Sequence, residues 1–227
     1  MFVGKRLSLN DIKFMPQNKA KSRSLMEIAV IDDEKFKDAQ ALTKNGFRIT
    51  ELGDISDIKS VSEYSIVVCD IRGVGKSFQT KHGAGFVISE IKQRYPDKYI
   101  IVYSGSAVDP TYKRYLDKCD DSIRKSADVA EWTNTLDVAI EEMANPTKRW
   151  KRLRTIFLNS DMELYDVFLF EQAYIKSFSK KNHQILEAAM KDNSLLDKEE
   201  LLNESAKALI AFAANVIGSG LVTYMAR

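Results

Sequence analysis

The sequence predicts a doubly wound α/β domain with a parallel sheet, followed by a smaller all-α domain. Short apolar runs at 28–31, 66–69 and 100–103 have the length and composition of buried strands. Segments with helical spacing separate them between residues 26 and 145. Strands that alternate with helices form right-handed crossovers, which cover a parallel sheet on both faces. The pattern therefore favours five strands in the flavodoxin-like (βα)5 arrangement.

Further elements follow in chain order. A first helix is expected over 34–44, because apolar residues recur on one face and Asn45 and Gly46 form a stop signal. Another helix is expected to begin near Gly85, and a weaker strand lies at 122–123. The last helix of the domain is expected to open at Ser126 as its N-cap.

The character of the sequence changes after Asn145 and Pro146, where the valine- and isoleucine-rich runs end. We therefore expect an irregular N-terminal arm over 1–25, an α/β domain over 26–145 and an all-helical output or oligomerisation domain over 146–227.

Composition excludes few function classes. Acidic and basic residues nearly balance at a net charge of +2, which gives no global argument for nucleic-acid binding. Cys69 and Cys119 fall at predicted strand positions, so a disulfide scaffold is not expected and a reducing cytosol is favoured. Because no apolar signal-peptide core follows Lys5 and Arg6, we expect a cytoplasmic protein.

Polar side chains follow the predicted strands at the points where they end. Asp32 and Asp33 follow the first apolar run, Asp70 the second and Ser104 the third, while Lys125 follows the weak fourth. In an open parallel sheet, ligands bind beyond the carboxyl ends of the strands. These five side chains are therefore expected to converge at one edge.

Three carboxylates, a hydroxyl and an ammonium group suit a magnesium-dependent phosphoryl transfer. The acids would hold Mg²⁺. Lys125 would pair with the transferred oxygens, and the Ser104 hydroxyl would donate to a phosphoryl oxygen. Asp70 would then be the nucleophile and form an aspartyl phosphate.

This arrangement resembles the receiver domain of two-component response regulators, over about half of the chain. Four stretches carry the resemblance: IAVIDD at 28–33, IVVCD at 66–70, IIVYSG at 100–105 and DDSIRK at 120–125.

The resemblance implies that a histidine kinase or phosphotransfer protein phosphorylates Asp70. It also implies a metal site formed by Asp32, Asp33, Asp70 and the backbone carbonyl of Arg72. The reactions expected of the chain are its own phosphorylation and slow autodephosphorylation, so it is not expected to be an enzyme with an external substrate.

The sequence departs from the family pattern at several positions. Ser104 stands where threonine is frequent, Ser126 replaces the usual proline, and Ser122 replaces the aromatic residue that swings inward on activation. The glycine-rich loop after Asp70 is longer than usual, which leaves open a lid, a partner surface or an ordinary solvated loop. A degenerate receiver that switches without phosphate also stays open.

The C-terminal part offers no catalytic constellation. The basic stretch at 148–154 is interpreted as a solvated helix turn with Trp150 and Leu153 packed inward, and the aromatic helix over 164–178 as core or a subunit interface. The segment 208–226 carries no charged residue, and its length approaches that of a membrane-spanning helix. A buried helix of a bundle or dimer is favoured over insertion.

Our leading hypothesis is a response regulator in which phosphorylation of Asp70 controls association of the helical domain, with a homo-oligomer expected. The alternative is a membrane-perturbing or pore-forming effector that acts through 208–226 and joins the membrane when activated. A DNA-binding regulator that uses the basic stretch is the least favoured hypothesis.

Overall fold

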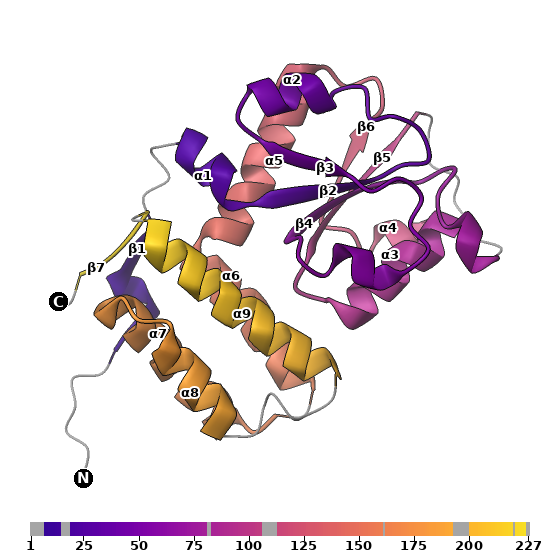
Figure 1. Ribbon diagram of the computed structural model, residues 1–227. Helices are drawn as coiled ribbons and strands as arrows, with labels where there is room; N and C mark the ends of the chain where they lie inside the picture. Colours follow the sequence, from indigo (N-terminus) through magenta and orange to yellow (C-terminus); the bar gives the residue numbers. More distant parts are fainter. Residues whose placement is uncertain are drawn as a thin grey trace, which may run out of the picture. The chain divides into compact units, whose positions relative to one another are not determined.

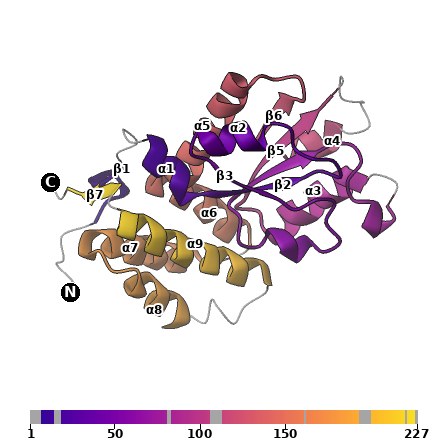
Figure 2. The same ribbon diagram turned by 45° about the horizontal axis from the view of Figure 1, so that its top comes forward.

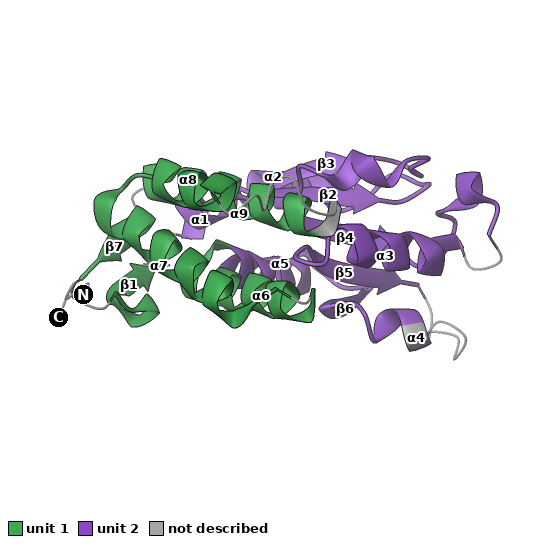
Figure 3. Cartoon of the chain, turned by 90° about the horizontal axis from the view of Figure 1, so that it is seen from below, with its two compact units in different colours: residues 1–18, 144–227 green, residues 19–143 purple. Residues whose placement is uncertain are grey.

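The computed structural model describes residues 7–14, 19–80, 83–105, 113–160, 162–192, 200–219 and 221–225. The chain forms two compact units (Figure 3). One consists of residues 19–143, and the other joins residues 1–18 to residues 144–227.

The unit of residues 19–143 contains a five-stranded sheet (Figure 1). Every strand pair in it is parallel, and the order β3-β2-β4-β5-β6 places the first strand of this sheet between the second and the third. This is the doubly wound order of flavodoxin-like folds. The predicted fold class of this part is confirmed. The strands are β2 (Glu27–Ile31), β3 (Arg48–Glu51), β4 (Ile66–Asp70), β5 (Tyr99–Ser104) and β6 (Asp121–Arg124).

Helices cover both faces of this sheet (Figures 1 and 2). Helices α2 (Ala39–Lys44) and α5 (Val129–Ala144) lie on one side, and α3 (Gly83–Arg94) and α4 (Lys113–Leu116) on the other. Between β3 and β4 the connection carries only the 3-10 turn η2 (Ile58–Val61) instead of a helix.

Two predicted helix starts were wrong. The helix expected over 34–44 begins only at Ala39. In the segment before it, the Glu34 N–H donates to Asp32 Oδ1 and the Phe36 N–H donates to Glu51 Oε2. Glu51 ends β3, so a contact with the sheet holds this segment, and no local sequence pattern indicates such a contact.

The last helix begins at Val129 and not after Ser126. Asp128 Oδ1 accepts the Glu131 N–H at 2.8 Å, and Glu131 Oε2 accepts the Asp128 N–H at 3.1 Å. This reciprocal capping box is the stronger start signal.

The side chains of β5 alternate between two cores. Ile100 and Val102 belong to a buried cluster that includes Val87 and Ile91 of α3. Tyr103 lies among aromatic rings instead, with centroids 5.7 Å from Phe36 and 5.6 Å from Trp132, both edge-on. The carboxyl end of β5 therefore rests on a packed aromatic cluster.

The expectation of an irregular arm over 1–25 was wrong for its described residues. Helix α1 (Lys19–Leu25) belongs to the unit of the sheet. Arg23 Nε lies 2.7 Å from Asp137 Oδ1 of α5, and the Arg23 guanidinium lies 4.4 Å from the centre of the Phe47 ring. Long-range contacts of this kind have no local sequence signal.

The other unit is mainly helical. Its strands β1 (Ile12–Phe14) and β7 (Val222–Tyr224) form an antiparallel pair in which Ile12 lies opposite Tyr224. The expected arm thus also supplies a strand and the preceding 3-10 turn η1 (Leu9–Asp11). The helices are α6 (Pro146–Asn159), α7 (Leu164–Lys180), α8 (Gln184–Asp192) and α9 (Glu200–Ser219).

The basic stretch opens α6. Asn145 Oδ1 accepts the backbone N–H groups of Thr147 and Lys148, and Pro146 occupies the first turn, both favourable start signals. Trp150 and Leu153 are fully buried, as predicted. The Trp150 ring stacks on Tyr174 of α7 with centroids 5.2 Å apart, so the basic stretch contributes part of the core of this unit.

The charge-free segment 208–226 is not one helix. Helix α9 ends at Ser219, whose hydroxyl donates to the Val216 carbonyl and accepts the Leu221 N–H, and β7 follows. Ala226 lies outside the described residues. Within the described part of the chain, no helix has the length and apolar character needed to cross a membrane.

Candidate functional site

Strand register brings the predicted site residues to one edge of the sheet. Ile31 lies opposite Cys69, so the next residues, Asp32 and Asp70, are neighbours. On the other side of β4, Asp70 lies opposite Tyr103, immediately before Ser104. Ser104 lies opposite Arg124, so Lys125 follows directly.

Asp70 is the most enclosed carboxylate of the site, with only 2% of the residue exposed. Lys125 Nζ lies 2.5 Å from its Oδ2, and the Arg72 N–H donates to its Oδ1 at 3.1 Å. Burial raises the pKa of Asp70, and these two contacts offset that effect only in part. Asp70 is thus a desolvated carboxylate with a cation held against it.

Lys125 reaches two of the acids, because its Nζ also lies 3.8 Å from Asp32 Oδ2. Desolvation acts to lower the Lys125 pKa, but the hydrogen bond to Asp70 and the two negative charges outweigh it, so the pKa is raised. The ammonium group therefore stays charged at neutral pH.

Asp32 is also buried, and Tyr103 orients it by donating its phenolic O–H to Asp32 Oδ2. Burial, followed by this hydrogen bond, raises the pKa of Tyr103, so the phenol remains a donor. The other oxygen, Asp32 Oδ1, accepts the Glu34 N–H at 2.9 Å.

Asp33 is more exposed and has a different partner. Lys76 Nζ, from the loop after β4, lies 2.6 Å from Asp33 Oδ2. This hydrogen bond and ion pair lower the pKa of Asp33 and raise that of Lys76. Asp33 and Asp70 therefore differ in the direction of their pKa shifts.

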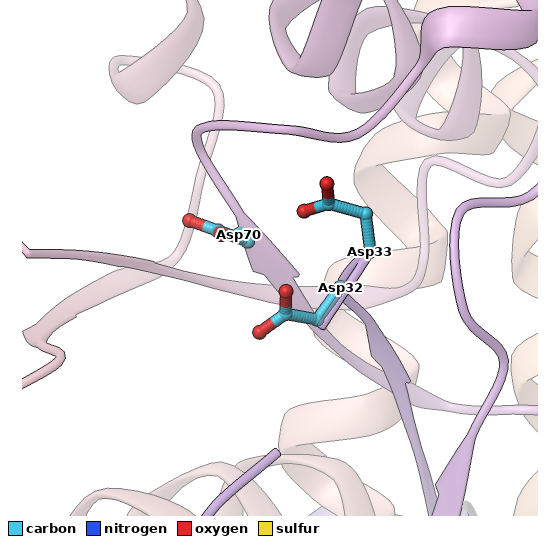
Figure 4. Close-up of side chains that lie close together, drawn as sticks. All are labelled: Asp32, Asp33 and Asp70. Carbon is cyan, nitrogen blue, oxygen red and sulfur yellow. The ribbon is translucent and has the colours of Figure 1, made fainter. Parts of the chain in front are cut away.

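The three carboxylates form a compact oxygen cluster (Figure 4). One oxygen each of Asp32, Asp33 and Asp70 lies within 4.8 Å of the others. An all-oxygen, partly buried anionic donor set is what Mg²⁺ prefers, so the residues present fit this ion. The carbonyl of Arg72 remains a predicted ligand.

Ser104 is buried at the end of β5, and its carbonyl accepts the Lys125 N–H at 2.8 Å. A cavity of about 650 Å³ adjoins it, lined by segments of β5, β6 and α5, including Ser122. Ser122 contributes a small side chain to the lining of this cavity.

Sequence reasoning missed several residues of this site. Lys76 and Asp54 lie in loops, Gly73 passes against Asp33, and Tyr103 was assigned only to a strand. The glycines after Asp70 were the one available signal, because they pointed to an unusual backbone path. The partner of each missed side chain lies more than 20 residues away in sequence.

No protein-family model matches this chain, and no curated protein matches it. The solved structures similar to it include receiver domains of response regulators that cover about half of the chain. The NtrX receiver domain of Brucella abortus is 21% identical, covering 51% of this chain and 98% of its own, with a TM-score of 0.43. A CheY-like receiver domain protein of Methanospirillum hungatei is 16% identical, with coverages of 52% and 96% and a TM-score of 0.45. The chemotaxis protein CheY4 of Vibrio cholerae is 10% identical, with coverages of 50% and 98% and a TM-score of 0.42.

Proposed function

We propose that this protein is a response regulator of a two-component system, whose receiver-type unit is phosphorylated on Asp70 by a histidine kinase or phosphotransfer protein. The observation that carries the proposal is the buried Asp70 carboxylate in contact with Lys125, beside Asp32 and Asp33. The four charged side chains together supply the nucleophile, the cation and the metal donors that a phosphoryl transfer needs.

The residues have distinct roles in this proposal. A carboxylate oxygen of Asp70 attacks phosphorus, the bond to the donor's histidine nitrogen breaks, and an acyl phosphate forms. Lys125 neutralises phosphoryl oxygens, and Ser104 donates a hydrogen bond to one of them. Asp32, Asp33, Asp70 and the Arg72 carbonyl would hold Mg²⁺, which would offset the charge of the incoming phosphoryl group.

Phosphorylation can be tested with acetyl phosphate and Mg²⁺. Wild type should gain one phosphoryl group by intact mass, labile to hydroxylamine, and borohydride trapping should place it at residue 70. Asp70→Asn should gain none, whereas Asp117→Asn, at an exposed position after α4, should behave as wild type. Equal labelling of Asp70→Asn, or no labelling of wild type, would refute the proposal.

We further propose that the output is self-association through an α7 patch formed by Leu164, Tyr165 and Phe168. Among the described residues, these are three of five strongly exposed large hydrophobic side chains, and they lie within two turns of one helix. Exposed apolar surface that is concentrated in this way is typical of an interaction site.

Charges around the α7 patch favour a second copy of this chain as the partner. Lys151 and Arg154 of α6 line cavities that Phe168 shares, while Glu163 and Asp166 lie at the start of α7. A two-fold interface joins a patch to itself, so a patch that carries charges of both signs can pair with its own copy.

Light scattering tests the output. With Mg²⁺ and beryllofluoride, which mimics a phosphoryl group on aspartate, wild type should change its molar mass and Asp70→Asn should not. Tyr165→Ser should lose the change, while Val138→Ser, which removes an exposed hydrophobic side chain in α5, should retain it. An unchanged mass in phosphorylated wild type would exclude self-association as the output.

A further inference from the structure

Lys76 is a cation of the site that the predicted chemistry does not use. Its ammonium group lies 2.6 Å from Asp33 Oδ2, and Asp33 is one of the three clustered carboxylates. An exposed lysine beside an acid is ordinary on a protein surface, so the contact alone decides nothing. The backbone that carries Lys76 makes it informative.

Asp54 anchors the loop independently of the Lys76 side chain. Its Oδ1 accepts the Gly75 N–H at 2.5 Å, and its Oδ2 accepts the Lys76 N–H at 3.2 Å. The 3-10 turn η3 (Lys76–Phe78) begins at this point. The backbone of Lys76 is thus held in place whether or not its ammonium group binds Asp33.

Gly73 brings the same loop against the same carboxylate. Its φ of +81° lies in the left-handed region, and a Cβ atom at this position would lie 2.0 Å from Asp33 Oδ1. Two features separate from the ion pair, the Asp54 anchor and the Gly73 approach, therefore position Lys76 at Asp33.

We propose that Lys76 is a tethered cation that competes with the divalent metal ion for Asp33. The inference rests on the metal site of the proposed function. The ammonium group uses a lone pair of Asp33 Oδ2 that a metal ion would otherwise take, and a nearby positive charge lowers the affinity of the site for a second cation. Lys76 is 66% exposed in its side chain, so it can turn to solvent while Asp54 keeps its backbone in place.

This competition sets the metal concentration at which the site loads. With Asp33 released by Lys76, the acid cluster becomes available for Mg²⁺; with Asp33 paired, the cluster has one carboxylate fewer. Phosphorylation of Asp70 would then require a higher Mg²⁺ concentration than in a site without this lysine.

Calorimetric titration with Mg²⁺ tests the inference on the full chain. Lys76→Gln should bind Mg²⁺ about twofold to fivefold more tightly than wild type, the range expected for removing one exposed ion pair. Lys76→Arg keeps the charge and should bind as wild type. Lys59→Gln removes an exposed lysine from η2, before the amino end of β4, and controls for net charge.

Several outcomes would overturn the inference. One is a Mg²⁺ affinity of Lys76→Gln that is equal to or weaker than that of wild type. Another is a gain in Mg²⁺ affinity in Lys59→Gln as large as in Lys76→Gln. The third is a gain in Mg²⁺ affinity in Lys76→Arg, which would indicate a loosened loop and not an effect of charge. If Mg²⁺ binds wild type and Asp70 is phosphorylated, such results refute only the role of Lys76. If neither wild type nor Lys76→Gln binds Mg²⁺, the metal site of the proposed function fails as well.

Discussion

Two lysine–aspartate pairs lie at the same edge of the sheet, and they differ mainly in burial. In the pair of Asp70 and Lys125, the side chains are 2% and 33% exposed; in the pair of Asp33 and Lys76, they are 26% and 66% exposed. A buried pair is costly to break, because the remaining charge has no water to replace its partner. An exposed pair exchanges partners easily. Asp70 and Lys125 therefore form a fixed pair, whereas Asp33 and Lys76 form a pair that can exchange partners.

The largest expected difference concerns the loss of each lysine. Lys125→Met leaves the Asp70 carboxylate buried without its nearest cation and should lower the free energy of unfolding by about 2 kcal/mol. Lys76→Met should lower the free energy of unfolding much less, because water can solvate Asp33. Urea unfolding of both variants without divalent ions measures this. Equal effects would show that burial does not distinguish the two pairs.

A smaller effect is expected from the glycine that adjoins the exposed pair. Gly73→Ala must place a side chain at a positive φ and displace the Asp33 carboxylate, which should cost about 1–2 kcal/mol and weaken Mg²⁺ binding. Gly46→Ala also has a positive φ, but nothing lies within 4 Å of its added Cβ. It should cost about 1 kcal/mol and leave Mg²⁺ affinity unchanged.

Thermal unfolding measures the stability of Gly73→Ala and Gly46→Ala, and calorimetric titration measures their affinity for Mg²⁺. The same Mg²⁺ affinity in the two would mean that Asp33 tolerates displacement and contributes little to the metal site.

The smallest effect is in the pH dependence of stability, where the two acids should have opposite signs. Burial raises the pKa of Asp70, so its ionised form lowers the free energy of unfolding as pH rises above about 4. The hydrogen bond from Lys76 lowers the pKa of Asp33, so its contribution is stabilising above about pH 4 and is lost below it.

Asp70→Asn should therefore be more stable than wild type at neutral pH, with an advantage that shrinks on acidification. Asp33→Asn should be slightly less stable at neutral pH and approach wild type only below about pH 4. Denaturant titrations of both variants and wild type from neutral pH to below about pH 4, without divalent ions, test these expectations. An advantage of Asp70→Asn that grows on acidification would contradict the assigned direction for Asp70.

The sequence alone determined the α/β class and the five residues that the sheet brings to one edge. Both depend on local signals, since apolar runs specify strands, and the residue after each run lies at the carboxyl end of its strand. The same signals did not locate the helix starts at Ala39 and Val129. The reciprocal cap of Asp128 and Glu131 decided the second, and the segment before the first is held by a contact with Glu51 of β3.

Only the tertiary structure decided which residues far apart in the chain contact one another. Four contacts join residues far apart in the chain: Lys76 with Asp33, Tyr103 with Asp32, Asp54 with the backbone of the loop after β4, and β1 with β7. A side chain that contacts a distant residue leaves no periodicity and no fixed spacing, since its position depends on how the whole sheet and its loops fold. The residues of the predicted chemistry could thus be identified in advance, whereas the contacts that distinguish Asp33 from Asp70 could not.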